Sequence, residues 1–253
     1  MFEEVVPMPL RRPRPAMRDL LYLSESKMEV LVPQLPGRVR ERLGLEAGLN
    51  AGVLSLKASL SSDSRTSLVG ALNAVVKMIE RKHGHRQRTD QGLAVGSWIE
   101  FEEEFRFGSA WPGSGDGRDR PVVDGLVYFA AAQYPQHPPF ALVGSLAHLL
   151  DRRRPTSDGD SDSQQVGHLY IEAIRAYAQA VQELPDRAAI GDLSTLGSTD
   201  HALSAVTLLC EVDAPHLEGW KPPVRLAGVA RILAVNDFGS ILATPLYVEY
   251  ASR

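Results

Sequence analysis

Residues 98–107 alternate between apolar and mostly charged side chains, and this pattern constrains the fold more than any other in the chain. Successive side chains of a β-strand point to opposite faces of the sheet, so a period of two predicts a strand with one buried face. The apolar face carries Ile99, Phe101, Phe105 and Phe107, and the other face carries Trp98, Glu100, Glu102, Glu104 and Arg106. Glu103 departs from the pattern, because a regular strand directs its carboxyl group toward the apolar face.

Further strands and helices are predicted from residue 20 to residue 250. Continuous or alternating apolar runs predict strands at 20–23, 51–60, 126–132, 140–146, 205–212, 224–235 and 240–250, the last two joined by a hairpin turn at 236–239. Residues 27–32, 38–45, 68–79 and 169–184 have the pattern of helices. Ser26 and Glu29 match a capping box at the start of the first helix, and residues 188–204 are ambiguous.

Strands separated by helices over the whole chain predict an α+β fold. We expect a mixed, mainly antiparallel sheet, or two such sheets, with helices packed on the faces. A single domain is predicted at residues 17–253, with two pseudo-equivalent halves divided at 152–165 as an open alternative. Residues 152–165 are rich in arginine, serine and aspartate, which predicts a mobile loop, and residues 1–16 are predicted to be a flexible extension.

Composition narrows the class of protein. Of the 253 residues, 44% are hydrophobic and 23% charged, and the formal net charge is -4, which does not indicate a nucleic-acid-binding protein. The single cysteine, Cys210, excludes an intrachain disulfide and a metal site built from cysteines. The longest apolar stretches are shorter than the ~20 residues of a membrane helix, and the N-terminus lacks a signal-peptide pattern, so we expect a cytoplasmic protein without membrane contact.

Several segments distributed over the chain carry a resemblance to known sequences. They are Leu20-Leu21-Tyr22-Leu23-Ser24-Glu25-Ser26-Lys27, the helix segment 75–80, the strands 126–129 and 141–145, and Leu242-Ala243-Thr244-Pro245-Leu246-Tyr247-Val248. These segments resemble a family of uncharacterised actinobacterial proteins over nearly the whole chain from Arg18. The resemblance supports a single domain and implies a bacterial setting in specialised metabolism or conflict systems, but it implies no activity and no catalytic residues.

Glu103 is the first candidate for catalysis. Its flanking phenylalanines predict a desolvated carboxyl group, an environment in which a carboxyl can serve as general acid or base. The predicted complement is His148, which follows an apolar strand, or His168, which opens a helix. The structural alternative is a buried ion pair for Glu103 and hydrogen-bonded, half-buried histidines.

The segment Ser24-Glu25-Ser26-Lys27 matches Ser-x-x-Lys, in which a lysine one turn after a serine can deprotonate it for attack on an acyl carbon. The Ser-Asp-Asn and Lys-Thr-Gly elements of enzymes that use this motif do not occur in the sequence. The capping box accounts for the segment structurally, so we predict a helix start here and not a nucleophile.

We predict neither a metal site nor a cofactor. The closest histidines, His83 and His85, lie among lysines and arginines whose charge opposes a cation. Asp158, Asp160 and Asp162 lack the glycine and the glutamate that complete a calcium loop.

Two hypotheses about function follow. In the first, the protein is non-catalytic and binds a small ligand or a protein partner in a cleft between sheet and helices, with Trp98, Tyr128 and His148 near its mouth. In the alternative, it is a small-molecule enzyme of specialised metabolism that uses Glu103 with His148 or His168 as an acid/base pair.

Charged and edge-forming segments raise further hypotheses about partners. Arg118 and Arg120, after a glycine-rich segment, are candidate contacts to an anionic ligand. Basic clusters at 38–42, 77–88 and 152–154 could bind phosphate groups if the fold joined them, but no aromatic residues are interleaved, so nucleic acid is disfavoured. An exposed edge on the C-terminal hairpin would allow pairing between chains, which makes a homo-oligomer a third hypothesis.

Overall fold

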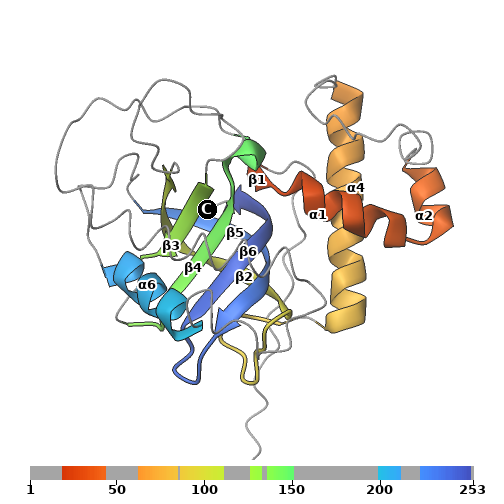
Figure 1. Cartoon of the computed structure of the whole chain (residues 1–253). Helices are drawn as coiled ribbons and strands as arrows, with labels where there is room; N and C mark the ends of the chain where they lie inside the picture. The colour runs from red at the N-terminus through yellow and green to blue at the C-terminus, as the bar shows by residue number, and fades with distance from the viewer. Residues whose placement is uncertain are drawn as a thin grey trace, which may run out of the picture.

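The computed structural model describes residues 19–43, 62–84, 86–110, 126–132, 136–150, 199–211 and 223–251, and these form an α+β structure (Figure 1). Its elements are β1 (Leu20–Leu23), α1 (Glu25–Leu31), a 3-10 turn η1 (Val32–Gln34), α2 (Gly37–Arg42), α4 (Ser62–His83), β2 (Trp98–Ala110), β3 (Leu126–Ala131), β4 (Phe140–Ser145), a second 3-10 turn η3 (Leu146–His148), α6 (Thr199–Glu211), β5 (Val224–Val235) and β6 (Ile241–Tyr250). Within these ranges, no helix combines the length and apolar character needed to cross a membrane.

In the described part of the chain, β2, β3, β4, β6 and β5 close into a five-stranded barrel. Neighbouring strands follow that order around the wall, and β5 pairs with β2 to complete the circle. The pairs are antiparallel except for β4 with β6, which is parallel. β1 extends the wall beside the second half of β6, where Leu23 is paired with Tyr247. The expectation of a mixed, mainly antiparallel sheet is confirmed, but its closure into a barrel was not foreseen.

The barrel interior is a packed core of alternate residues from every strand of the wall. The inward side of β2 carries Ile99, Phe101, Phe105 and Phe107, as its alternation predicts. The rings of Phe101, Phe105 and Phe140 meet edge to face with centroids 5.4 to 5.8 Å apart. Such aromatic contacts add to the burial of the rings, so the packed interior stabilises the fold.

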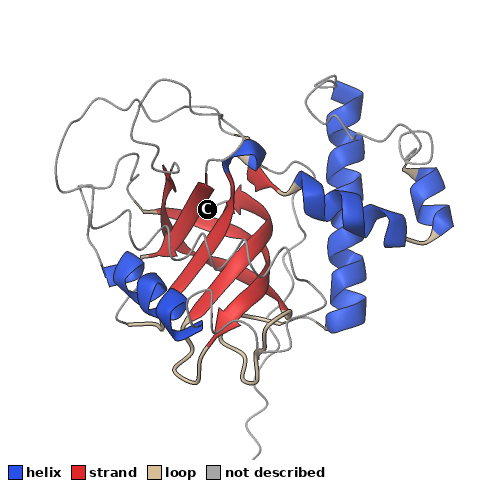
Figure 2. Ribbon diagram, viewed as in Figure 1, coloured by secondary structure: helices blue, strands red, loops and turns tan. Residues whose placement is uncertain are grey.

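Helices cover two sides of the barrel (Figure 2). On one side α6 packs on the outer face of β3 and β4, where Tyr128 and Val143 contact its apolar stripe. On the other side α1 and α4 pack over β5 and β6, with Val229 and Leu246 in the same cluster as Val76. The prediction of helices on the faces of the sheet is therefore confirmed.

The barrel has five strands, as do oligonucleotide- and oligosaccharide-binding (OB) barrels. Barrels of that type bind their ligands on the face of the second and third strands. Those strands are β3 and β4 here, and α6 covers their outer face. The number of strands is therefore no argument for a nucleic-acid ligand, since a fold alone does not assign function.

Several sequence predictions need correction. The segment 205–212 is not a strand, because its described residues 205–211 belong to α6, whose buried residues Ala202, Leu203, Val206 and Leu209 recur at helical spacing. The second half of α6 contains a short apolar run that also fits a strand. The first turns of the helix lie in residues 188–204, whose pattern is ambiguous, so the helical spacing is not visible in the second half alone. The N-cap of α1 is Ser24 and not Ser26, since the Ser24 side chain accepts a hydrogen bond from the amide of Lys27.

Two further expectations concern the C-terminal strands. The barrel draws strands from both sides of residues 152–165, so the chain is not divided into two pseudo-equivalent halves. The C-terminal hairpin is not an open edge either, because β5 pairs with β2 and β6, while β6 also contacts β4 and β1. Among the described strands, this hairpin therefore leaves no unpaired edge for pairing between chains.

Some predictions lie outside the described residues. They are the extension 1–16, the strand 51–60, the loop 152–165, the helix 169–184, and the candidate residues Arg118, Arg120 and His168.

Candidate functional site

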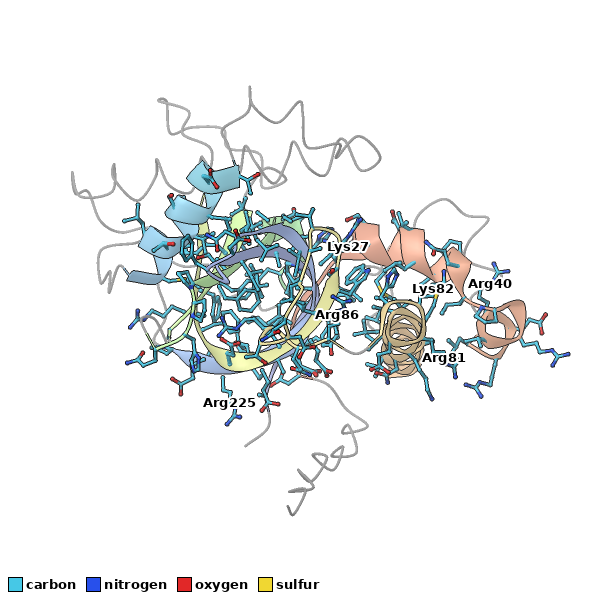
Figure 3. The ribbon with its side chains drawn as sticks, turned by 90° about the horizontal axis from the view of Figure 1, so that it is seen from below. Lys27, Arg40, Arg81, Lys82, Arg86 and Arg225 are labelled. Atoms are coloured by element: carbon cyan, nitrogen blue, oxygen red, sulfur yellow. The ribbon has the colours of Figure 1, made fainter. Side chains whose placement is uncertain are left out.

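The junction of β1 and α1 is fixed to the barrel wall at Ser24. The Ser24 amide donates to the carbonyl of Leu246 on β6 at 2.8 Å, so the chain turns into α1 directly beside β6. The Ser24 hydroxyl accepts from the amide of Lys27 at 3.4 Å and satisfies one of the amides that a helix start leaves open. Because Lys27 stands one turn into the helix, its side chain lies between α1 and the barrel (Figure 3).

The amine of Lys27 contacts two buried hydroxyl groups. Its Nζ atom donates to Oγ1 of Thr244 on β6 at 2.8 Å and to Oγ of Ser24 at 3.4 Å. Ser24 and Thr244 are only 1% and 2% exposed, so both hydroxyls are held behind the amine. Burial, and next the positive charge of Arg231, lower the pKa of Lys27 from 10.5 to about 8.

Arg231 and Trp98 continue this cluster along one row of the barrel wall. Arg231 on β5 is the register partner of Thr244 on β6 and of Trp98 on β2, so the three residues stand on the same outer face. Directly opposed side chains on neighbouring strands have Cβ atoms roughly 5 Å apart. Arg231 is exposed, and its Nε atom donates to the carbonyl of Gly96 at 3.4 Å. We name Ser24, Lys27, Arg231 and Thr244 the Lys27 cluster.

Neither cation of the Lys27 cluster is neutralised within the described ranges. Lys27 donates to hydroxyls and Arg231 to a backbone carbonyl, and no carboxylate of those ranges pairs with either. Cations are normally paired when they are withdrawn from water, because desolvation of a charge is unfavourable. Among the described residues, the cluster therefore presents two positive charges and two hydroxyl groups without an anionic partner.

Beside the cluster lies a small crevice between the C-terminal end of α4 and the wall of β2 and β5. Trp98, Val229, Ile79 and Arg86 are among its lining residues, and its volume of about 20 Å³ accommodates about one water molecule. Trp98 is 9% exposed under α4. By itself this crevice is too small for an organic ligand, so it is not the ligand cleft that the sequence predicts.

His148 contacts Tyr22, a residue of β1 that precedes Ser24 by two positions. The Tyr22 hydroxyl lies 3.4 Å from Nδ1 of His148, and the two rings meet edge to face at 5.9 Å. Burial raises the pKa of Tyr22, while a side-chain hydrogen bond with Ser24 lowers it.

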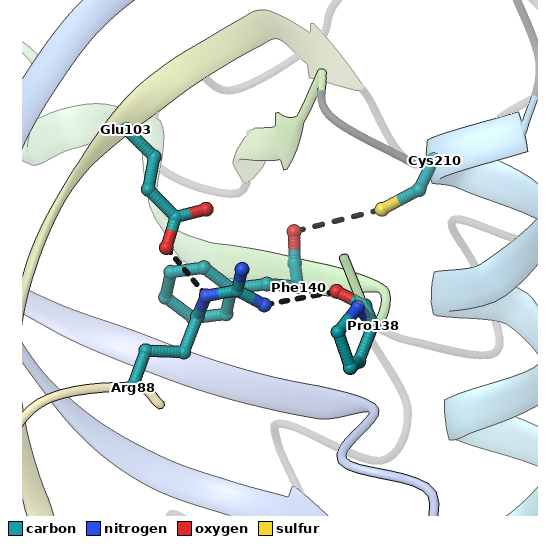
Figure 4. Close-up of polar contacts among 5 residues, drawn as sticks. All are labelled: Arg88, Glu103, Pro138, Phe140 and Cys210. Atoms are coloured by element: carbon teal, nitrogen blue, oxygen red, sulfur yellow. Dashed lines mark hydrogen bonds and ion pairs between the residues drawn. The ribbon is translucent and has the colours of Figure 1, made fainter. Parts of the chain in front are cut away.

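Glu103 is held in a buried ion pair, as the structural alternative expects (Figure 4). Its Oε1 atom accepts a hydrogen bond from Nε of Arg88, whose Nη1 atom donates to the carbonyl of Pro138 at 2.9 Å. The Arg88 guanidinium lies 5.4 Å from the centroid of the Phe140 ring. Arg88 is 8% exposed, so this pair belongs to the core at one end of the barrel.

The buried thiol of Cys210 lies beside this ion pair, 3.5 Å from the carbonyl oxygen of Phe140. Burial raises the pKa of Cys210 to about 11, against smaller opposing effects of backbone hydrogen bonds. The sulfur is therefore a protonated thiol near neutral pH, the unreactive form of cysteine.

The structure does not unite the residues that the sequence singled out. Phe140 beside Arg88 and Ser145 before His148 are the two ends of β4, so Glu103 and His148 are separated by roughly 16 Å of strand. Tyr128 is 2% exposed beneath α6, on the other side of the wall from the helices that cover Trp98. Trp98, Tyr128 and His148 therefore do not share one mouth.

The Lys27 cluster was missed although one half of it was visible in the sequence. Ser-x-x-Lys marked Ser24 and Lys27, and the structure brings Nζ to Oγ as that motif requires. Ser24 is nevertheless 1% exposed and its hydroxyl caps a helix, so it is not placed to attack a substrate. Thr244 lies 217 residues from Lys27 along the chain, and no local pattern connects them.

Comparison with known proteins gives a family without an assigned activity. The model of a family described as of unknown function (DUF7019) matches residues 18–252, and the chain belongs to this family. The resemblance to an uncharacterised family is confirmed at that level. No curated protein and no solved structure matches the chain.

Proposed function

We propose that this protein, a member of a family of unknown function, binds a small anionic ligand at the Lys27 cluster. Membership of that family assigns no chemistry, so the proposal rests on the contacts of the cluster. The observation that carries the proposal is the juxtaposition of Lys27 and Arg231 without a carboxylate partner in the described chain. A cation that has lost its water and has no counter-ion is unfavourable. A bound anion supplies the missing negative charge. We therefore expect the charges of Lys27 and Arg231 to determine binding.

The groups of the cluster suit a carboxylate or a phosphate. Lys27 offers a point charge, and the hydroxyls of Ser24 and Thr244 hold its amine in place. Arg231 offers a planar guanidinium, whose parallel N–H groups match two oxygens of one carboxylate or phosphate group. The adjacent crevice has room for about one water molecule, so we expect the ligand on the rim of the cluster with its apolar part toward Trp98.

The alternative of an acid/base pair of Glu103 and a histidine gains no support from the contacts. Glu103 is engaged by Arg88, and His148 by Tyr22. We therefore place recognition on the cation cluster and assign the Arg88–Glu103 pair to stability.

Thermal unfolding of the full chain in a low-chloride buffer at pH 7 tests the proposal. Sodium phosphate, sulfate and acetate are the probes, and the wild type is expected to gain melting temperature with anion concentration. An anion present at a hundred times its Kd stabilises the folded state by about 2.7 kcal/mol. The gain is expected to shrink at pH 9, because the Lys27 amine, with a pKa of about 8, is then mostly neutral.

Two variants separate specific binding from a general salt effect. Lys27→Met is expected to lose most of the anion-dependent gain, whereas Lys77→Met, at an exposed position of α4, is expected to keep it. Phosphate and sulfate also stabilise proteins by exclusion from their surface, which is independent of Lys27. An equal gain in all three chains would overturn the proposal.

A further inference from the structure

We infer that the Lys27 amine forms a reversible imine with a carbonyl group of the bound anion, so that the ligand class is a short oxo acid or a similar anionic carbonyl compound. The inference rests on the proposed anion site, since it names the ligand class and the covalent step at that same site. It is carried by the hydrogen bonds of Nζ, the position of Arg231 and the partial burial of the lysine.

The hydrogen bonds of Nζ leave one position of the nitrogen open. An ammonium group has three N–H donors. Two are directed to Oγ1 of Thr244 and Oγ of Ser24, and no other partner of Lys27 occurs in the described ranges. When the amine is neutral, the same two hydrogen bonds persist and the lone pair takes the third position. The site thus orients the nitrogen for attack on a carbon atom.

The surroundings of Lys27 favour the neutral, nucleophilic amine. Burial and the nearby charge of Arg231 lower the pKa to about 8. Roughly a tenth of the molecules then carry a neutral amine at pH 7, compared with roughly three in ten thousand for an ordinary lysine. Desolvation and a neighbouring cation are the two devices by which proteins activate lysine for imine formation.

The covalent step needs no reagent other than the ligand. The lone pair of Nζ attacks the carbonyl carbon, the π electrons move to the carbonyl oxygen, and that oxygen takes up the proton released from nitrogen. The resulting carbinolamine loses its hydroxyl group and the remaining N–H hydrogen as water, which leaves a C=N bond. The hydroxyls of Thr244 and Ser24, already bonded to Nζ, are placed to relay these protons.

Arg231 sets the size of the ligand. It is the register partner of Thr244, to which Nζ is bonded, so its guanidinium extends from the position next to the amine. The strands that carry Arg231 and Thr244 are roughly 4.8 Å apart, so we expect the anionic group and the carbonyl group of the ligand to be close neighbours in one small molecule. A carboxylate directly beside the carbonyl, as in a 2-oxo acid, fits this spacing.

Reductive trapping tests the inference on the full chain. Glyoxylate, an anionic aldehyde, and propanal, a neutral aldehyde, are added at equal concentration at pH 7 with cyanoborohydride, which converts an imine into a stable amine. Peptide mass spectrometry then compares modification of Lys27 with that of Lys77, the exposed lysine of α4. We expect glyoxylate to modify Lys27 at least tenfold faster than Lys77, and propanal to show a much smaller preference.

The variant Arg231→Met sharpens the result, because it removes the anion contact and leaves the amine. Removal of the Arg231 charge also raises the pKa of Lys27, which slows both aldehydes, so the readout is the ratio of the glyoxylate rate to the propanal rate at Lys27. This ratio is expected to fall severalfold. The inference is overturned if glyoxylate modifies Lys27 of the wild type no faster than Lys77. This comparison uses the wild-type chain alone, so it does not depend on the folding of a variant. If phosphate still stabilises the wild type through Lys27, the anion site then stands and only the imine is lost. If phosphate also fails, the site itself is lost.

Discussion

Two cations lie against the barrel wall, and the fold satisfies them in opposite ways. Arg88 has a carboxylate from Glu103, a backbone carbonyl from Pro138 and an aromatic face from Phe140. Lys27 has two neutral hydroxyls and a second cation, Arg231, as its neighbours. The guanidinium of Arg88 is thus paired and desolvated, whereas the amine of Lys27 is largely desolvated and has no counter-ion in the part of the chain that the structure describes.

This difference separates a structural charge from a functional one. A buried charge whose partners are complete has little capacity left for a ligand, and its removal is felt in stability. A charge held only by neutral groups has its ionisation shifted and retains an affinity for anions. Glu103 is conspicuous in the sequence because it is an acid among phenylalanines, but our proposal places ligand binding on Lys27, which has no carboxylate partner among the described residues.

The largest effect is expected from Arg88→Met. The substitution removes the guanidinium and leaves the Glu103 carboxylate without its cation in the core, which costs roughly 3–5 kcal/mol of unfolding free energy. Urea unfolding at pH 7 measures the loss. Adding Glu103→Gln in the same chain removes the stranded charge, so we expect part of the stability to return.

The exposed pair of Arg225 and Glu102 is the matched control for this test. Its nitrogen and oxygen are 3.0 Å apart, but the two side chains are 63% and 54% exposed. Solvent screens such pairs, so Arg225→Met is expected to change the unfolding free energy by no more than about 1 kcal/mol. If Arg88→Met and Arg225→Met lower the free energy of unfolding equally, the buried pair contributes no more to stability than the exposed pair.

The next effect concerns the pH dependence of stability. The pKa of Lys27 is about 8 in the folded chain and 10.5 in its ordinary state. Between these values the unfolded chain binds more protons than the folded one, so the free energy of unfolding rises with pH. The whole contribution amounts to about 3 kcal/mol, and it is expected to be absent from Lys27→Met.

Urea unfolding at pH 7, 8, 9 and 10 measures this contribution as the difference between wild type and Lys27→Met. Groups common to both chains, such as Cys210 and Tyr22, cancel in the difference. Lys27→Met should have its greatest advantage at pH 7, where the folded wild type still carries the desolvated charge. If the free energies of unfolding of the wild type and Lys27→Met change with pH in parallel, Lys27 titrates as an ordinary lysine. Lys77→Met is the control, and its curve is expected to run parallel to that of the wild type.

Much of the fold followed from local patterns in the sequence. The alternation around Phe101 and Phe105 defined β2 and its inner face, and the apolar runs of β3, β4, β5 and β6 were recognised. Barrel closure was not predictable, because it depends on register between distant residues such as Trp98 and Arg231. The strand predicted in place of α6 failed because a short β-branched run fits a strand and one buried helix stripe equally well.

The site was predictable only where its residues are neighbours in sequence. Ser24 and Lys27 form a recognisable Ser-x-x-Lys motif. The Ser24 hydroxyl both contacts the Lys27 amine and caps α1, so the motif describes a real contact and the helix-cap interpretation is also correct. Thr244 and Arg231 enter only through the β5–β6 register. An acid on an apolar face was a correct observation about Glu103, but the position of its partner Arg88 required the fold.

The smallest effect is expected from Thr244→Val, which removes one acceptor from Lys27 and nearly preserves side-chain volume. Loss of the 2.8 Å hydrogen bond leaves a buried N–H group unsatisfied and costs about 1–2 kcal/mol at pH 7. The loss should diminish at pH 10, where the amine is neutral and needs the acceptor less. Thr207→Val is the control, because that hydroxyl donates to Leu203 within its own helix and is partly exposed, so we expect a change below about 0.5 kcal/mol. A Thr244→Val loss that is the same at pH 7 and pH 10 would mean that the hydroxyl packs against the wall without holding the charge, and the comparison between the two cations would then rest on Ser24 and Arg231 alone.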